Sequence, residues 1–345
     1  MPRCACYPAM ADSPPLRMLI IGLSNIGDAL LTADVIDEVR RAFPEAHLAL
    51  LVGERARPLF DGDPRIQTLL VADRYESVIG RCRLLAALWR YRPQVVVDLR
   101  STLYPLLLKP LASWRYLRWP PRALRHMRDR HRWKLRAQVP GIARRLDRAP
   151  AGSPFWASDS DRAHVEQLLR RWQVDGAASL AVIAPGARSH LKRWMPEGFA
   201  AVADRLIAER GLQVVFTGEP DETPVVDAVA AHMARRAHSA VGLLTIRQLG
   251  VLMARARLVV TNDSGALHLA SLVGAPTVAV FGPTDPAKYG PRAGRARVVR
   301  RKLFCAPCER PLCRYQHECM RFIPPEEVYA AAASMLDGSS VEAAP

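Results

Sequence analysis

The sequence predicts an α/β protein built from two Rossmann-like domains that face a central cleft. Three observations support this prediction. Short apolar segments rich in β-branched residues alternate with amphipathic helical segments, which is typical of parallel sheets covered by helices. The alternation breaks at residues 149–160, a stretch rich in Pro, Gly, Ser and Asp, and then starts again. The chain has 345 residues, half of them apolar, which is enough for two hydrophobic cores.

The domain boundary is expected just after a helix predicted for residues 161–172. The first domain then spans residues 1–175 and the second spans residues 176–323. Residues 1–16 precede the first predicted strand and are expected to form a disordered tail. They contain no apolar core of a secretory signal, so no signal peptide is expected.

Composition narrows the classes of partner. The formal net charge of +16 favours acidic partners such as nucleic acid, an anionic membrane surface or a phosphorylated substrate. No run of about 18 apolar residues occurs, so no segment is expected to span a membrane. The seven cysteines are an odd number without a secretory signal, so a disulfide framework is not expected.

The first half opens with a strand at 17–22, a helix at 28–42 and a strand at 47–52. The loop between Gly22 and Gly27 has the glycine spacing of a phosphate-binding loop, but Asp28 stands where that motif has lysine. A carboxylate repels phosphate and can accept a proton, so this loop predicts a catalytic base at Asp28. The alternative is that Asp28 only caps the helix and interacts with its dipole.

Further strands are predicted at 66–71 and 95–99, with a helix at 81–89 between them. Asp98 and Arg100 follow the second of these strands and are expected to face the cleft. From residue 100 to 148 the chain is strongly basic, with tryptophans such as Trp114 and Trp119 between the cations. This pattern suits an anionic membrane or glycolipid. Nucleic acid and a simple solvated helix face remain alternatives.

The second half repeats the α/β pattern, starting with a strand at 180–184. The loop after it carries Arg188 and Lys192, which predict a clamp for a diphosphate, although a basic surface turn would have the same composition. A helix from Pro196 and a strand at 213–217 follow, and Glu222 comes shortly after that strand. An acidic residue in this place can accept hydrogen bonds from ribose. Thr245 is expected to cap the next helix.

The most informative stretch runs from residue 258 to 286. It predicts a buried strand, a turn through Asp263 and Ser264, a short helix starting at Gly265, and a second buried strand at 277–281. Free backbone N–H groups at the helix start would face an anion, and Gly265 would let it approach closely. A crossover turn that binds no ligand is the alternative.

This stretch resembles the donor-site signature of glycosyltransferase family 9, the ADP-heptose:lipopolysaccharide heptosyltransferases. The matching residues are Asn-Asp-Ser-Gly-x-x-His-Leu-Ala from residue 262, Gly-x-Pro from 274 and Phe-Gly-Pro-Thr-Asp-Pro from 281. The other hallmark of the family is Gly-x-x-Gly-Asp at the start of the first helix, and residues 24–28 resemble it in Gly27 and Asp28, with Ser24 in the place of the first glycine. The resemblance extends from about Met18 to Met335.

The resemblance implies a GT-B architecture and an inverting transfer of heptose from ADP-heptose to the lipopolysaccharide core, without a metal or cofactor. Asp28 would be the catalytic base in an acceptor-binding first domain. The last helix, at 324–335, would cross back to the first domain before a frayed tail. The expected donor-binding residues are Arg188, Lys192, Glu222, Leu244, Asp263, Ser264, Gly265 and His268, and the expected acceptor-binding residues are Asp98 and Arg100. His268 could instead pack within its helix.

Some predictions concern location and alternatives. The enzyme is expected in the cytoplasm, peripheral on the cytosolic face of the bacterial inner membrane, with no nucleic-acid partner. An alternative function is a GT-B sugar-nucleotide epimerase, and another is a non-catalytic nucleotide-sugar-binding or anionic-surface protein. No metal site is expected, although the spacing of four cysteines leaves zinc as an alternative. These are Cys305, Cys308, Cys313 and Cys319.

Overall fold

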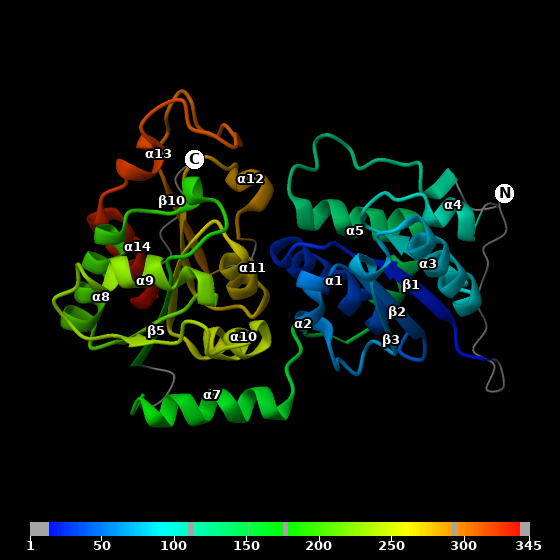
Figure 1. The fold of residues 1–345 in the computed structure, drawn as a ribbon, viewed down its shortest axis with the longest axis horizontal. Coiled ribbons are helices and arrows are strands. Elements are labelled where there is room, and N and C mark those ends of the chain that lie inside the picture. The colour runs from blue at the N-terminus through cyan, green and yellow to red at the C-terminus, as the bar shows by residue number, and fades with distance from the viewer. Residues whose placement is uncertain (1–13, 110–113, 151, 175–178, 292–294, 339–345) are drawn as a thin grey trace.

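The computed structural model describes residues 14–109, 114–150, 152–174, 179–291 and 295–338. Two α/β domains lie side by side, each around a parallel sheet (Figure 1). The predicted fold class is therefore confirmed. Most of the expected N-terminal tail, the frayed C-terminus and the boundary at residue 175 lie outside the described residues.

The first sheet has the order β3-β2-β1-β4. Helix α3 (Val78–Tyr91) covers one face through Leu84 and Leu88, whereas α1 (Ile26–Ala42) and α5 (Met127–Gln138) cover the other. Because both faces are covered, β1, β2 and β4 consist mainly of buried apolar residues, whereas the edge strand β3 is only partly buried. The remaining elements are β1 (Arg17–Ile21), β2 (His47–Val52), β3 (Thr68–Val71), β4 (Val95–Asp98), α2 (Arg57–Phe60), α4 (Tyr104–Leu108) and α6 (Ile142–Leu146).

The second sheet has the order β10-β9-β8-β5-β6-β7. The order reverses between β5 and β8, and ligands of open α/β sheets bind outside the carboxyl ends of strands at such a switch point. The strands are β5 (Leu180–Ala184), β6 (Gln213–Phe216), β7 (His238–Ser239), β8 (Leu258–Asn262), β9 (Thr277–Phe281) and β10 (Ala296–Arg300). The helices are α7 (Asp159–Arg171), α8 (Pro196–Arg210), α9 (Thr223–Ala230), α10 (Ile246–Arg255), α11 (Gly265–Leu272), α12 (Pro286–Tyr289), α13 (Glu318–Arg321) and α14 (Pro325–Leu336).

Local signals in the sequence placed most elements within one or two residues. The strands predicted at 47–52, 180–184 and 277–281 have the predicted bounds. Thr245 caps α10, and its side chain accepts a hydrogen bond from the backbone N–H of Gln248 in a capping box. Helix α1 begins two residues earlier than expected, so its N-cap is Asn25 and Asp28 lies in the first turn. Asp28 is therefore not the N-cap of this helix, although its charge still lies where it interacts favourably with the helix dipole.

Two expectations about the domains are also wrong. Helix α14 does not cross back to the first domain, because Val328, Tyr329 and Ala332 are buried in the same cluster as Phe199 of α8. Helix α7 lies before the predicted boundary at residue 175 but packs on α10 of the second domain. It is held there by an ion pair from Arg247 to Asp161, so by packing the second domain begins before α7.

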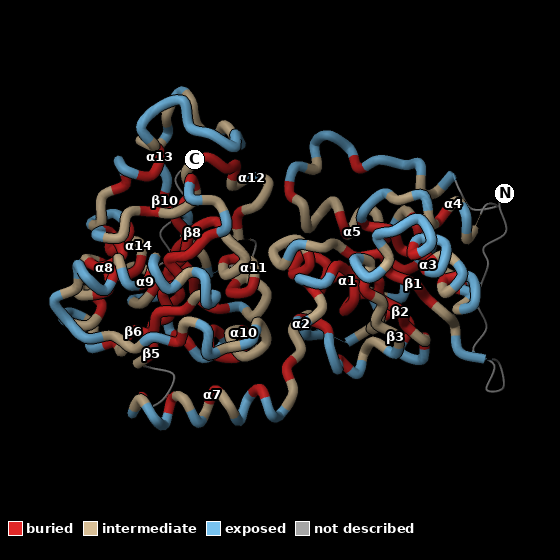
Figure 2. The backbone as a smooth tube through the Cα atoms, viewed as in Figure 1, coloured by how far each residue is buried: buried red, intermediate tan, exposed pale blue. Residues whose placement is uncertain are grey.

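The two domains meet where α1 packs against α11, on the facing sides of the two lobes in Figure 1. One hydrophobic cluster runs across this seam and includes Leu30 and Val35 of α1 together with Leu269 of α11. Figure 2 shows that the buried residues gather in the central strands of both sheets and along α1. Among the described residues, no helix is long and apolar enough to cross a membrane.

The cations of the basic segment fall into two groups. Two cations of α5 turn inward to α1, where Arg132 Nε lies 2.6 Å from Glu38 Oε1 and Arg128 pairs with Asp34. Both carboxylates are buried, so these arginines neutralise charge inside the domain. The preceding residues 114–125, which we call the first arch, have exposed tryptophans at Trp114 and Trp119. Fewer cations of residues 100–148 are therefore available at the protein surface than the sequence alone suggested.

Candidate active site

The N-termini of α1 and α11 lie opposite each other across the seam between the domains. A Cβ atom added to Gly27 would lie 3.2 Å from Cδ2 of His268, and one added to Gly265 would lie 3.6 Å from Cγ2 of Ile26. The first contact is tight, so a side chain at position 27 would press on the His268 ring. The second is an ordinary contact, so packing within the protein does not explain the glycine at position 265. Gly265 lies at the positive end of α11, where an anion would bind.

Asp28 is linked to the second domain through Asn25. The Asn25 amide nitrogen donates to Asp28 Oδ2 at 3.3 Å, and Asn25 Oδ1 accepts from Arg188 Nη1 at 3.1 Å. The predicted base and a predicted donor-binding cation are therefore two hydrogen bonds apart. Asp28 is half-buried, in the first turn of α1, where its negative charge interacts favourably with the helix dipole.

Lys192 and Asp263 form the closest ion pair of the predicted donor residues. Lys192 Nζ lies 2.7 Å from Asp263 Oδ2; the aspartate side chain is 3% exposed and the lysine side chain 31% exposed. The loop that carries Lys192 is fixed by the buried Asn262. Its amide oxygen accepts from the backbone N–H of Trp194 at 3.0 Å, and its amide nitrogen donates to the carbonyl of Pro185 at 2.7 Å.

Glu222 lies against the same loop from the neighbouring strand end. A Cβ atom at Gly186 would lie 2.1 Å from Glu222 Oε1, so the carboxylate occupies the space that a side chain would need. Its Oε2 accepts a hydrogen bond from the backbone N–H of Glu219 at 3.0 Å. Burial raises the pKa of Glu222 above its ordinary value. The structure thus brings Glu222 and Lys192 to the switch point of the sheet, while Leu244 lies half-buried just before α10.

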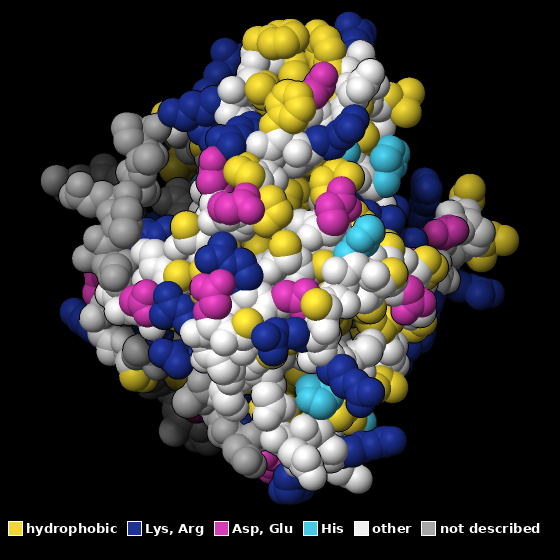
Figure 3. All heavy atoms as spheres, turned by 90° about the vertical axis from the view of Figure 1, so that its left-hand side faces the viewer, with side chains coloured by type: hydrophobic (Ala, Val, Ile, Leu, Met, Phe, Trp, Pro, Cys, Tyr) yellow, Lys and Arg dark blue, Asp and Glu magenta, His cyan; other side chains and the backbone are white. Residues whose placement is uncertain are grey.

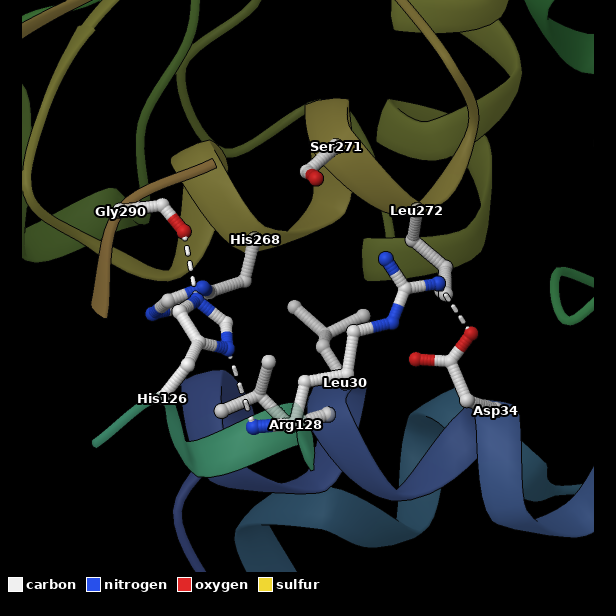
Figure 4. Close-up of a pocket in the computed structure, with 9 residues that line it drawn as sticks. Leu30, Asp34, His126, Arg128, His268, Ser271, Leu272 and Gly290 are labelled. Carbon is white, nitrogen blue, oxygen red and sulfur yellow. Dashed lines mark hydrogen bonds and ion pairs between the residues drawn. The ribbon is translucent and has the colours of Figure 1, made fainter. Parts of the chain in front are cut away.

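His268 faces the seam between the domains. Burial lowers its pKa, opposed by the nearby carboxylates of Asp263 and Asp28, so the imidazole is neutral at neutral pH. In Figure 4 its ring lies beside that of His126, at a small cavity between α1 and α11. Nε2 of His126 bonds to the carbonyl of Gly290 at 2.8 Å, which ties the first domain to the second. The alternative that His268 only packs within its own helix is therefore wrong.

The predicted acceptor residues occupy different environments. Asp98 is buried, and its carboxylate accepts hydrogen bonds from the backbone N–H groups of Arg100 and Thr102 and from the Thr102 hydroxyl. Burial raises its pKa. Asp98 therefore holds the turn after β4, and its predicted direct contact with an acceptor is not supported. Arg100 is exposed and is available to one.

The cysteine segment provides no arranged metal site in the described part of the chain. Four of its thiols are free, at Cys305, Cys308, Cys313 and Cys319. Across the described ranges, no three His, Cys, Asp or Glu side chains are grouped so that they could hold a metal ion. Burial and the neighbouring thiols raise the pKa of Cys319 to about 11, so that thiol is protonated at neutral pH.

Sequence reasoning missed the residues that join the domains. Besides Asn25 and His126, Arg125 Nη2 contacts Asp285 Oδ2 at 2.5 Å across the seam. Asp285 belongs to the Phe-Gly-Pro-Thr-Asp-Pro sequence, and this motif was the only indication that Asp285 has a role. Its partner Arg125 is 160 residues away in the sequence. No local pattern identifies such a partner.

The fold and the site together define a class of protein. Two Rossmann-like domains that meet at a seam, with the start of α11 on one side and the Asp28 carboxylate on the other, have the GT-B architecture. The comparisons agree with this class. The model of glycosyltransferase family 9 (heptosyltransferase) matches residues 147–318. Lipopolysaccharide heptosyltransferase 2 of Escherichia coli K12 is 24% identical over 307 residues, covering 83% of this chain and 88% of that protein.

Two solved structures have the same fold. The glycosyl transferase family 9 from Veillonella parvula DSM 2008 superposes with a TM-score of 0.79 at 23% identity, covering 96% of this chain and 100% of that chain. The E. coli heptosyltransferase WaaC with ADP gives a TM-score of 0.65 at 19% identity, covering 92% of this chain and 99% of that chain. The chain belongs to glycosyltransferase family 9 and is a glycosyltransferase.

Proposed function

We propose that this protein transfers heptose, with inversion, from ADP-heptose to the inner core of lipopolysaccharide. The observation that carries the proposal is that Asp28 lies in the first turn of α1, whose N-terminus meets the start of α11 across the seam between the domains. The names of the relatives support the sugar and the acceptor class, because the relative described above is a lipopolysaccharide heptosyltransferase.

In the proposed reaction, an acceptor hydroxyl attacks the anomeric carbon of the donor as the bond to the diphosphate breaks. Asp28 accepts the hydroxyl proton, and ADP leaves with the bonding electrons. Attack from the side opposite the leaving group inverts the anomeric centre. Lys192, Arg188 and the N–H groups at Ser264 and Gly265 stabilise the charge on the departing diphosphate.

The other donor residues have binding roles in this proposal. Glu222 accepts hydrogen bonds from the nucleoside, and Leu244 packs on the adenine. Asp263 binds heptose hydroxyls with the oxygen that does not contact Lys192, and His268 closes the pocket as a neutral imidazole. Arg100 meets the anionic acceptor on the first domain. No metal is required in this proposal, because cationic side chains provide the charge that a divalent ion provides elsewhere.

The membrane side of the proposal concerns the first arch. Its exposed Trp114, Leu117 and Trp119 stand among arginines, and Arg115 lies over the ring of Trp114 at 5.2 Å. Such a surface suits the boundary between lipid headgroups and acyl chains. We therefore place the enzyme in the cytoplasm, peripheral on the cytosolic face of the inner membrane, where its acceptor is embedded.

The test of function is a product assay. Purified protein is incubated with a panel of nucleotide sugars and a truncated core lipid, and the products are analysed by mass spectrometry and by NMR of the anomeric signals. We expect transfer from ADP-heptose only, with an inverted linkage. A retained anomeric configuration would contradict Asp28 as the base of a single displacement. Interconversion of a free nucleotide sugar without an acceptor would instead support an epimerase.

A further inference from the structure

Residues 301–322 of the second domain, which we call the second arch, expose large apolar side chains. Phe304 is 88% exposed, Leu312 73% and Phe322 58%, and Tyr315 meets Phe304 edge to face with ring centres 5.2 Å apart. The arch surrounds a cavity of about 440 Å³ whose walls include Phe304, Leu312 and Tyr315. Clustered apolar side chains that remain in water mark an interaction surface.

The second arch is held in place at its base. The backbone N–H groups of Cys308 and Glu309 both donate to the carbonyl of Pro283, at 2.9 and 2.8 Å. Arg301 Nε donates to the carbonyl of Phe322 at 2.6 Å, which closes the arch where it begins and ends. The exposed side chains are therefore presented from an ordered support.

The charge of the second arch favours an anionic partner. Its sequence holds five Lys or Arg residues against two Glu residues. Glu309 lies 2.6 Å from Lys288 Nζ and Arg301 Nη2 lies 2.6 Å from Glu327 Oε1, so one charge of each sign is neutralised from outside the arch and the surplus stays positive. Arg310 and Arg314 are exposed close to Leu312. Figure 3 shows hydrophobic side chains at the upper end of the second domain with Lys and Arg around them.

The shape of the molecule points to a flat partner. In Figure 1 the second arch rises above α13 at the top of the second domain, and the first arch rises above α5 at the top of the first domain. Segments that carry exposed apolar residues and cations therefore lie at the same end of both domains. A bilayer surface can contact both tips at once, because it is flat and extends over the whole molecule.

We propose that the second arch inserts Phe304 and Leu312 into an anionic lipid surface, so that the two domains share one membrane-contact face. Arg310 and Arg314 then lie among the lipid phosphates. This inference deepens the membrane part of the proposed function, but it does not require that the transferred sugar be heptose. Contact through both arches would also fix the distance between the lipid surface and the seam where the two domains meet.

The experiment measures binding of the full chain to phosphatidylcholine vesicles with and without phosphatidylglycerol, by flotation. We expect Phe304→Ser with Leu312→Ser to lower the partition coefficient about tenfold or more. Arg310→Gln and Arg314→Gln should each lower it about fivefold on anionic vesicles and have no effect on neutral ones. Trp119→Ser should add its own loss to that of the double variant, because both arches contact one surface.

A substitution on a distant helix serves as the matched control for lost apolar surface. Ile79→Ser changes a side chain that is 68% exposed on α3 and should bind vesicles like the unaltered protein. Turnover on a water-soluble acceptor without acyl chains should be unchanged in the second-arch variants. If the unaltered protein has no such turnover, the proposed function fails while the vesicle result still stands. Wild-type vesicle binding by the Phe304 and Leu312 double variant would overturn the inference. If the double variant binds vesicles normally but sediments differently from the unaltered protein, the second arch is a protein interface and not a membrane contact.

Discussion

Replacing Asp28 by Asn tests the predicted catalytic base with little change in shape. The substitution removes the charge and the proton-accepting oxygen, while the new amide oxygen can still accept the hydrogen bond from Asn25 that now reaches Asp28 Oδ2 at 3.3 Å. Arg188 keeps its contact with Asn25, so the donor side of the seam is preserved. The variant therefore isolates proton transfer from positioning.

The expected loss in kcat is about 10²–10⁴-fold, the usual contribution of a general base. Stability should change much less. Asn25 is the N-cap, and Asp28 contributes only the interaction of its charge with the dipole of α1, about 0.3–1 kcal/mol. ADP affinity should not fall, because a carboxylate repels phosphate and does not help to bind a diphosphate.

The assay is kcat with saturating donor and acceptor, measured beside the thermal midpoint and the ADP affinity of the same preparation. A kcat near that of the unaltered protein, with an unchanged midpoint, would refute the reasoning. The base would then have to be sought at His268, whose neutral imidazole lies against the same turn. Asp98 would not be the next candidate, since its carboxylate already accepts three hydrogen bonds.

Three further predictions follow from the site and the core. Lys192→Ala should weaken ADP binding in calorimetry by about tenfold to a hundredfold, the value of a charged hydrogen bond; undiminished affinity would remove Lys192 from the diphosphate site. EDTA should leave turnover unchanged, and loss of activity restored by Mg²⁺ or Mn²⁺ would contradict the metal-independent mechanism. Burial lowers the pKa of His131 to about 4, so the unfolded chain binds more protons between pH 4 and the ordinary value of about 6.5. The contribution of His131 to the free energy of unfolding is therefore complete above that range. It should be lost, by about 3 kcal/mol, as the pH falls through the range. In His131→Leu this part of the pH dependence should be absent from urea titrations, and an unchanged slope would show that other groups cause it.

The sequence by itself determined the elements and the local features of the site. Apolar periodicity identified β2, β5 and β9 with their bounds, because a buried strand needs an unbroken apolar run. The turn at Asp263–Gly265 and the loop at Lys192 were found because each lies within a few residues of a strand end. These signals depend only on neighbouring residues, so they can be recognised without knowing how the chain packs.

Tertiary structure alone decided which distant residues meet. The sequence could not show that Arg128 and Arg132 neutralise buried carboxylates on α1, because each pair is more than 90 residues apart. The family resemblance placed α14 on the wrong domain. The sequence of the helix could not correct this, since an amphipathic pattern shows that one face is buried but not against which sheet. The role of Asp98 could not be predicted for the same reason. A carboxylate at a strand end can bind a ligand or hold a turn, and only the three hydrogen bonds that it accepts in the structure show that it holds the turn. The seam itself, where Asn25 joins Arg188 to Asp28, exists only once both domains have folded and packed together.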